Sequence, residues 1–135
     1  MANEHRRTMG TGTAEIEING SADQVWAVVG DFGGIGGWMP GIDSCRVEGE
    51  NRILETMGMT ITEQLVKKDD AARTLAYSIV AGAPVESHQA VIAVSPRGST
   101  CHVHWTVDAT PDEMADLMAG VYQQSLDALK AHVEG

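Results

Sequence analysis

The sequence has few cysteines, few basic residues and no long apolar run, and each shortage excludes a class of protein. Two cysteines, Cys45 and Cys101, are too few for a disulfide framework. No apolar run approaches the roughly 18 residues that a membrane-spanning helix needs. The opening residues are polar and unlike a signal peptide, so we expect a cytoplasmic protein with reduced thiols.

Basic residues are the second shortage. The chain has 9 Lys and Arg against 19 Asp and Glu, and its formal net charge is −10. Nucleic acids and anionic membranes are bound through basic patches, so we expect neither as a partner. The 135 residues, 43% of them hydrophobic, suffice for one domain with its own core. We expect a loose arm over residues 1–12 and a single domain over 13–135.

The N-terminal third of the chain changes pattern twice. Residues 13–19 alternate apolar and polar, which predicts a half-buried strand. A short helix should follow, capped by Ser21 and ended by Gly30. The next residues, 31–41, are rich in glycine but hold large apolar side chains. We expect a short helix or tight turn there, which tucks three of them under the sheet: Phe32, Trp38 and Met39.

The middle of the chain reads as β-structure throughout. Turn residues divide it into segments of strand length. Short breaks between consecutive strands imply hairpins and hence an antiparallel sheet. The predicted strands are 43–49, 51–57, 60–68, 73–81, 85–95 and 100–108.

The C-terminal residues predict one long amphipathic helix. Thr110 is a suitable N-cap, Pro111 suits the first helical position and Glu113 completes a capping box. The helix should run to about Val133, roughly 35 Å at 1.5 Å per residue. Its apolar stripe comprises Met114, Leu117, Met118, Val121, Tyr122, Ser125 and Leu129.

The resulting order is β–α–α–β6–α, an α+β fold. A curved antiparallel sheet of six to seven strands that grips one long helix satisfies this order. Such a sheet does not close on the helix along its whole length. The space that is left is a natural pocket for a small molecule.

Several stretches of this order resemble the helix-grip superfamily, also called SRPBCC or START-like, which includes polyketide cyclases and dehydratases, lipid-transfer domains, the birch pollen allergen and the abscisic-acid receptors. The resemblance extends from about residue 13 to 134. It is carried by VWAVVGDFGG at 25–34, WMPGI at 38–42, EQL at 63–65, DDAARTLAYSI at 69–79 and LDALK at 126–130. It implies a helix-grip fold that binds apolar or amphipathic molecules between sheet and helix. It does not specify an activity, because this fold serves many.

By resemblance to the abscisic-acid receptors, Glu63 matches a pocket glutamate and His88 stands where those receptors have a pocket tyrosine. Tyr77 and Ile79 match a strand that lines the pocket. Met39 replaces the lysine that anchors the hormone, and the gate loop is shortened to residues 56–59. These two departures argue against a carboxylate hormone and a gated receptor mechanism.

Strand parity suggests which polar residues face the pocket. If Glu63 points inward, its neighbours Ile61 and Leu65 do too, and burial would raise the pKa of the acid. His88 shares its inward face with Ala90, and a neutral imidazole near Glu63 would accept and return a proton near neutral pH. With a phenol hydrogen bond from Tyr77, these residues are the catalytic candidates. The alternatives are an acid paired across strands or at the wet mouth, and a core histidine bonded to a carbonyl or water.

Two other patterns indicate no metal and no cofactor. His102 and His104 share a strand face, but Val103, Trp105 and Val107 form the opposite apolar face, so both histidines should face solvent without a third ligand. The glycine run at 33–37 lacks the lysine of a phosphate-binding loop.

Two functions therefore stand open. The first is binding of a small hydrophobic or aromatic molecule, as in a carrier or sensor. The second is a cyclase or dehydratase in which Glu63 and His88 transfer protons at an enolisable carbon. A homodimer is compatible with the sequence, although no register for an interface can be read from it. The predicted ligand-binding residues are Phe32, Trp38, Met39, Met57, Met59, Ile61, Ile79, Ala90, Trp105, Leu117, Met118, Val121, Tyr122 and Ser125. Met114 joins the methionines that suit one adaptable cavity.

Overall fold

The computed structural model describes residues 8–135 and contains one antiparallel sheet with a long helix against it. The sheet has seven strands in the order β1-β7-β6-β5-β4-β3-β2, so each strand from β2 to β7 pairs with its neighbour in sequence and β1 closes against β7. The predicted α+β helix-grip architecture is thereby confirmed. The elements are β1 (Gly10–Ile18), α2 (Ala22–Val29), the 3-10 helix η1 (Phe32–Gly37), β2 (Ile42–Glu48), β3 (Asn51–Thr56), β4 (Met59–Asp69), β5 (Thr74–Ala81), β6 (Ser87–Arg97), β7 (Thr100–Thr110) and α3 (Asp112–Glu134).

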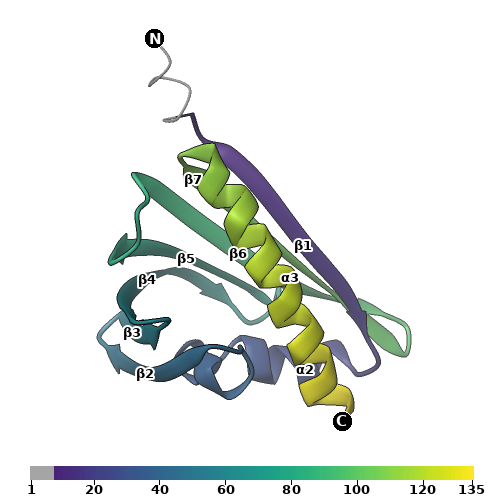
Figure 1. Ribbon diagram of the computed structural model, residues 1–135. Helices are drawn as coiled ribbons and strands as arrows, with labels where there is room; N and C mark the ends of the chain where they lie inside the picture. Colours follow the sequence, from purple (N-terminus) through teal and green to yellow (C-terminus); the bar gives the residue numbers. More distant parts are fainter. Residues whose placement is uncertain (1–7) are drawn as a thin grey trace.

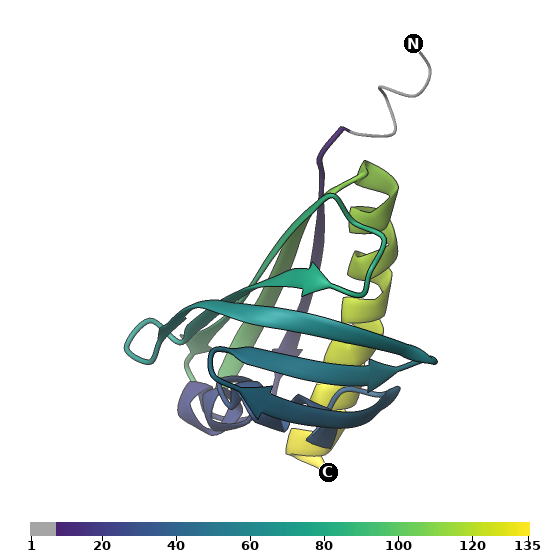
Figure 2. The ribbon, with the colours of Figure 1, turned by 90° about the vertical axis from the view of Figure 1, so that its left-hand side faces the viewer.

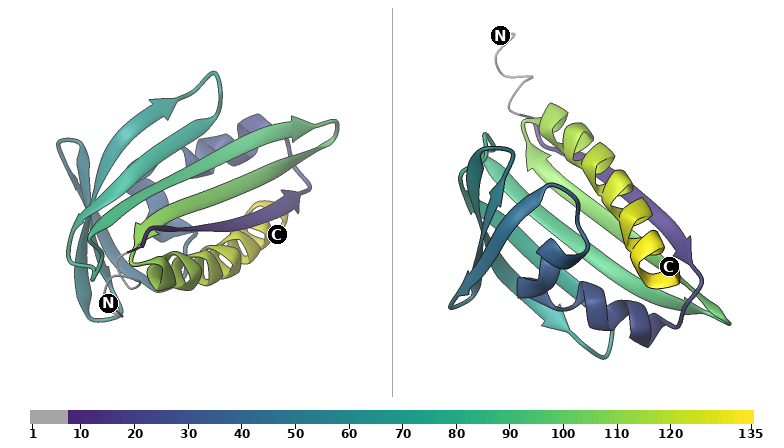
Figure 3. Two further views of the ribbon diagram at one scale, coloured as in Figure 1. Left: turned by 90° about the horizontal axis from the view of Figure 1, so that it is seen from above. Right: turned by 60° about the horizontal axis from the view of Figure 1, so that its bottom comes forward.

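The sheet curves strongly around α3. The helix packs mainly on β1 and β7, and β2–β5 swing out to its side (Figures 1 and 2). Seen from above and from below, α2 and η1 cover the end of the sheet that lies near the C-terminal half of α3 (Figure 3). The helix is therefore flanked closely on one side and loosely on the other.

The first strand begins earlier than predicted, at Gly10 instead of residue 13. The predicted loose arm therefore loses residues 10–12 to β1, and its first seven residues lie outside the described part of the chain. Gly12 has a packing role there. A Cβ on Gly12 would lie 2.6 Å from the carbonyl oxygen of Ala115 and 2.8 Å from the Cβ of Ala119, so only glycine allows α3 to lie this close to β1.

The start of α3 also differs from the prediction. The helix begins at Asp112, with Pro111 at the N-cap position and no side-chain capping bond. Thr110 is instead the last residue of β7, where its hydroxyl accepts a hydrogen bond from Ser87 at 2.8 Å. The capping-box prediction was wrong because the strand takes the residue that the helix was expected to use. Asp112 and Glu113 still lie in the first turn, where negative charge favours the helix dipole.

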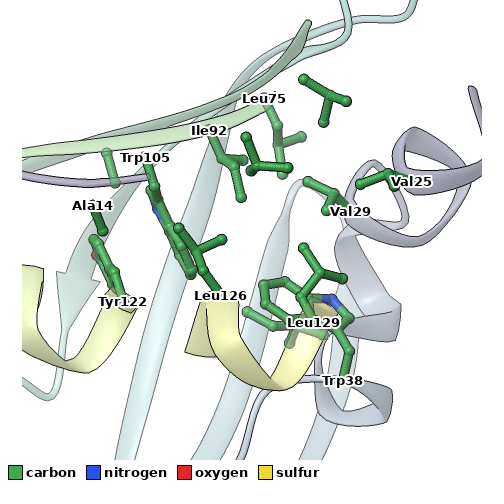
Figure 4. Close-up of a cluster of buried hydrophobic side chains, with 14 of the residues drawn as sticks. Ala14, Val25, Val29, Trp38, Leu75, Ile92, Trp105, Tyr122, Leu126 and Leu129 are labelled. Carbon is green, nitrogen blue, oxygen red and sulfur yellow. The ribbon is translucent and has the colours of Figure 1, made fainter. Parts of the chain in front are cut away.

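The hydrophobic core lies between the C-terminal half of α3, the sheet, α2 and η1. Leu126 and Leu129 from the helix meet Trp105 and Ile92 from the sheet, with Trp38 closing the end (Figure 4). The predicted inward face of β7 is confirmed, since Val103, Trp105 and Val107 are all buried. The short N-terminal helix is capped as predicted: the hydroxyl of Ser21 accepts from the amide of Gln24 at 3.0 Å.

Candidate functional site

A cavity of about 350 Å³ opens between the N-terminal half of α3 and strands β3, β4 and β5. It lies on the side of the helix where the sheet stands away. Most of its wall is apolar, and the methionines of three separate segments meet in it. It is lined by Met39, Pro40, Gly41, Ile42, Leu54, Thr56, Met57, Met59, Ile61, Glu63, Ile79, Ala83, Pro84, Met114, Leu117, Met118, Val121, Tyr122 and Gln124.

Many of the predicted lining residues are in this wall. They come from the loop before β2, from the β3–β4 turn together with β4 and β5, and from the first half of α3. The structure places in the cavity wall Met39, Met57, Met59, Ile61, Ile79, Leu117, Met118, Val121 and Tyr122, together with Met114 and Glu63. Because thioether side chains adapt to irregular apolar shapes, five methionines in one wall suit a guest without a fixed outline.

Other predicted lining residues lie elsewhere, and their placement corrects the predicted pocket. They face inward, as strand or helix parity required, but they are packed into solid core and not into the cavity wall. The structure places there Trp38, Tyr77, Ala90, Trp105 and Ser125, all buried, and Phe32, which is half-buried against Tyr77. The hydroxyl of Ser125 donates to the carbonyl oxygen of Val121 at 2.8 Å, within its own helix.

Sequence reasoning missed a buried arginine beside the cavity. Arg52 is 2% exposed, and its Nε donates to Oε1 of Glu63 at 2.7 Å. Its Nη1 donates to the carbonyl oxygen of Phe32 at 2.9 Å. The guanidinium lies over the rings of Phe32 and Tyr77, 4.1 and 4.7 Å from their centroids. The strand pattern could have revealed this arginine. Arg52 and Leu54 are two positions apart and share the buried face of β3, and Arg52 is the register partner of Glu63.

Of the alternatives for Glu63, the acid paired across strands is the one observed. Burial raises the pKa of Glu63, and the charge and hydrogen bond of Arg52 oppose that rise. A buried carboxylate without such a partner would be costly. The ion pair with Arg52 thus allows the carboxyl group of Glu63, on β4, to lie in a mainly apolar cavity wall.

His88 makes a structural contact where two strands separate. The β5–β6 pairing ends at Tyr77 and Ala90, and beyond it the amide of Ile79 donates to Nδ1 of His88 at 3.0 Å. The imidazole therefore takes a position that a backbone carbonyl occupies in a continuous ladder. Burial lowers the pKa of His88 from 6.5 to about 4, so the ring is neutral at neutral pH. It does not line the large cavity; it borders a smaller hollow of about 220 Å³ with Met9 and Asp108.

Tyr77 belongs to a buried row of polar side chains. Nε1 of Trp105 donates to its hydroxyl at 3.2 Å, and that hydroxyl lies 3.3 Å from the hydroxyl of Tyr122. The hydroxyl of Tyr122 lies 3.5 Å from Nε2 of His88. Tyr122 also stacks flat on Trp105, with ring centroids 3.9 Å apart. Tyr77 and His88 are thus joined through Tyr122, whereas the bonding partner of Glu63 is Arg52.

The two neighbouring histidines on β7 lie on the outer face. Nε2 of His102 is 3.0 Å from a carboxylate oxygen of Glu15, and the rings of His102 and His104 stack with centroids 6.2 Å apart. Among residues 8–135, no three His, Cys, Asp or Glu side chains are grouped as a metal site would require. No helix in that part of the chain is long and apolar enough to span a membrane.

Comparison with known proteins agrees with this architecture. Residues 9–134 match the model of the family described as polyketide cyclase / dehydrase and lipid transport. No curated protein matches the chain. Among solved structures, an uncharacterized protein from Bacillus thuringiensis is 33% identical, with a TM-score of 0.87 over 93% of this chain and all of that one.

Two further structures share the fold. The protein XoxI from Bacillus cereus is 33% identical, with a TM-score of 0.87 over 92% of this chain and 95% of that one. Norcoclaurine synthase from Thalictrum flavum, solved with dopamine and hydroxybenzaldehyde, is 18% identical, with a TM-score of 0.75 over 98% of this chain and 91% of that one. At 18% identity this last similarity concerns the fold alone.

Proposed function

Because the chain belongs to the polyketide cyclase/dehydrase and lipid transport family, we propose that it binds a small hydrophobic or aromatic molecule in the cavity between α3 and the sheet. The observation that carries the proposal is the cavity of about 350 Å³ with its mainly apolar wall. That volume is in the usual range of small-molecule sites. The size class agrees with the two aromatic molecules in the structure of norcoclaurine synthase.

The wall also favours binding by shape over binding by charge. Its apolar side chains include five flexible methionines and Leu117, which is 61% exposed. A guest that covers these side chains would remove apolar surface from water at about 25 cal/mol per Å². Transport of such a guest, a cytoplasmic location and a homodimer stay predictions.

The test is to fill the cavity with a larger side chain. Val121→Trp places an indole in the space, and Val80→Trp makes the same change at an exposed position outside the cavity wall. We expect the wild type and the Val80 variant to bind the uncharged fluorescent probe N-phenyl-1-naphthylamine saturably, and the Val121 variant to bind it at least about tenfold more weakly. Equal affinities of the two variants, or no saturable binding by the wild type, would reject the proposal. Native mass spectrometry of the purified chain would detect a guest retained from the host cell.

The second candidate is a cyclase or dehydratase in which Glu63 and His88 transfer protons. One observation favours it: the carboxylate of Glu63 is in the cavity wall. The contacts of His88 favour binding alone, because one ring nitrogen already accepts the amide of Ile79 and the ring lies outside that wall. If Glu63→Gln and His88→Ala bind a guest normally and leave any turnover unchanged, proton transfer by this pair is excluded.

A further inference from the structure

The row of buried polar side chains has more donor hydrogens than internal contacts. Trp105, Tyr77, Tyr122 and His88 form three successive contacts. The indole of Trp105 carries a single N–H and only donates. The hydroxyls of Tyr77 and Tyr122 each bring one hydrogen and also accept. The state of His88 therefore decides how the hydrogens are shared.

His88 can only donate toward Tyr122. Its Nδ1 accepts the backbone N–H of Ile79, so that nitrogen carries no hydrogen. A neutral imidazole has one N–H, which must then be on Nε2, the nitrogen that faces Tyr122. The hydroxyl of Tyr122 consequently has no acceptor in His88.

One hydroxyl hydrogen is left over. Trp105 and His88 fill the two outer contacts as donors, and the central contact between Tyr77 and Tyr122 uses only one of the two hydroxyl hydrogens. If Tyr122 donated, the hydrogen of Tyr77 would lack an acceptor in a packed core position that is 2% exposed. Leaving such a buried donor unpaired is costly. Tyr122 is also buried, at 5% exposed, but it is in the cavity wall, where a guest can supply an acceptor, and Tyr77 is not. Tyr77 therefore donates to Tyr122, and the hydrogen of Tyr122 is free for a guest.

We propose that the guest of this cavity is an uncharged lipophilic molecule with a carbonyl-type oxygen, which accepts a hydrogen bond from the hydroxyl of Tyr122. The inference rests on the proposed binding function. The oxygen belongs to a neutral group because the described residues of the cavity wall include no Lys, Arg or His to pair with an anion, and the acidic residue there is Glu63. Arg52 offers no compensation to an anion, since it is outside the wall and already bound to Glu63.

The test uses three naphthalenes of nearly equal size. They are 2-acetylnaphthalene, which has a ketone; 2-isopropenylnaphthalene, in which a methylene replaces the oxygen; and 2-naphthoate, which is an anion. We expect the wild type to bind the ketone about three- to tenfold more tightly than the alkene, and the anion more weakly than both. In Tyr122→Phe the ketone would enter without a donor, so the ketone-to-alkene affinity ratio should fall to one or below.

Tyr77→Phe is the matched control. It removes the other hydroxyl of the row, yet Tyr122 keeps its free hydrogen, so the preference for the ketone should persist. Loss of the preference in Tyr77→Phe with retention in Tyr122→Phe would reverse the order of donors and overturn the proposal. Because either variant could fold poorly, the wild type also supplies a direct reading. With a carbon-13 carbonyl, the infrared stretch of bound 2-acetylnaphthalene should lie below its frequency in hexane.

The outcomes separate the two proposals. If ketone and alkene both bind the wild type with equal affinity, or the carbonyl stretch is unshifted from hexane, the cavity binds guests but the assignment of Tyr122 is wrong. Tighter binding of 2-naphthoate than of the ketone would likewise overturn the preference for an uncharged guest. If the ketone and the alkene both fail to bind, the binding function itself is rejected, and the inference with it.

Discussion

The two halves of α3 face the same sheet but have opposite surroundings. In the C-terminal half, Leu126 and Leu129 are 0% exposed and pack against the sheet, α2 and η1. In the N-terminal half, Leu117 is 61% exposed, and Met114, Leu117 and Met118 border an open cavity. One continuous apolar stripe is therefore core at one end and cavity wall at the other.

The difference comes from the partners of the helix and not from its own sequence. Both halves are close to β1 and β7, on which α3 mainly packs. The C-terminal half lies at the end of the sheet that α2 and η1 close (Figure 3), and its leucines share one core with residues of these helices. The first half has β3, β4 and β5 at a distance, and the separation leaves the cavity. The stripe thus indicates which face is covered, while the topology decides how tightly.

The largest effect is expected at the border between the two regions, where Arg52 and Glu63 meet. Arg52→Leu would leave the carboxylate of Glu63 buried without its partner and should lower the free energy of unfolding by about 3–5 kcal/mol. Arg46→Leu is the control, because it breaks an exposed ion pair with Glu48 and should cost far less than the loss of the buried pair. Urea unfolding of both variants measures this. Equal losses of unfolding free energy in the two variants would show that the buried ion pair contributes no more to stability than the exposed one.

The same variant has a pH signature. Burial raises the pKa of Glu63, so the folded state binds this proton more tightly than the unfolded state, and protonation favours folding. Without Arg52 to oppose the rise, the deficit of Arg52→Leu should shrink as the pH falls through the raised pKa. A deficit that is constant with pH would show that Glu63 is not the group left unpaired.

The second effect tests the comparison directly with one substitution at two places on α3. Leu126→Ala at the closed end should lower the free energy of unfolding by about 2–5 kcal/mol, because it leaves a cavity in packed core. Leu117→Ala at the open end should change it by about 0.5 kcal/mol or less, since most of that side chain is already in water. Thermal or urea unfolding distinguishes the two. Similar losses would contradict the division of the helix into a packed and an open half.

The smallest effect concerns the stability in acid and His88, which lies where β5 and β6 separate. The pKa of His88 is about 4 in the folded chain and 6.5 ordinarily, so between these values the unfolded chain binds more protons. Stability should therefore decrease as the pH falls from about 6.5 to about 4. His88→Gln, whose amide oxygen can accept the N–H of Ile79, should reduce this acid dependence. His132→Gln, at an exposed position near the end of α3, should leave it unchanged; identical pH profiles in all three proteins would contradict the role given to His88.

Local patterns predicted the elements well because alternation and turn residues depend on near neighbours. The inward parity of β7, the hairpin order and the Ser21 cap followed from them, and the family resemblance was confirmed by the family model. Thr110 shows the limit of such reasoning. Its type suits a helix cap, yet its partner is Ser87, 23 residues earlier on the neighbouring strand β6.

The candidate site was harder to predict because its position depends on distance along the strands as well as on parity. Trp105 and Ile79 both face inward, but only Ile79 reaches the cavity. Arg52 was missed because an arginine in an alternating strand is ordinarily read as the exposed member. The wall residues Ala83 and Pro84 lie in a loop without periodicity, so no pattern could have included them.

The bare backbone of Gly12 has a consequence for how such a chamber can change. Because α3 lies against β1 there with almost no side chain between them, main-chain atoms fix the distance between the helix and the strand. Wall residues such as Met118 can then be replaced by larger or smaller ones without changing the distance between α3 and β1. Different residues therefore set the position of α3 and the shape of the cavity, so substitutions confined to the cavity wall would change its volume without moving the helix.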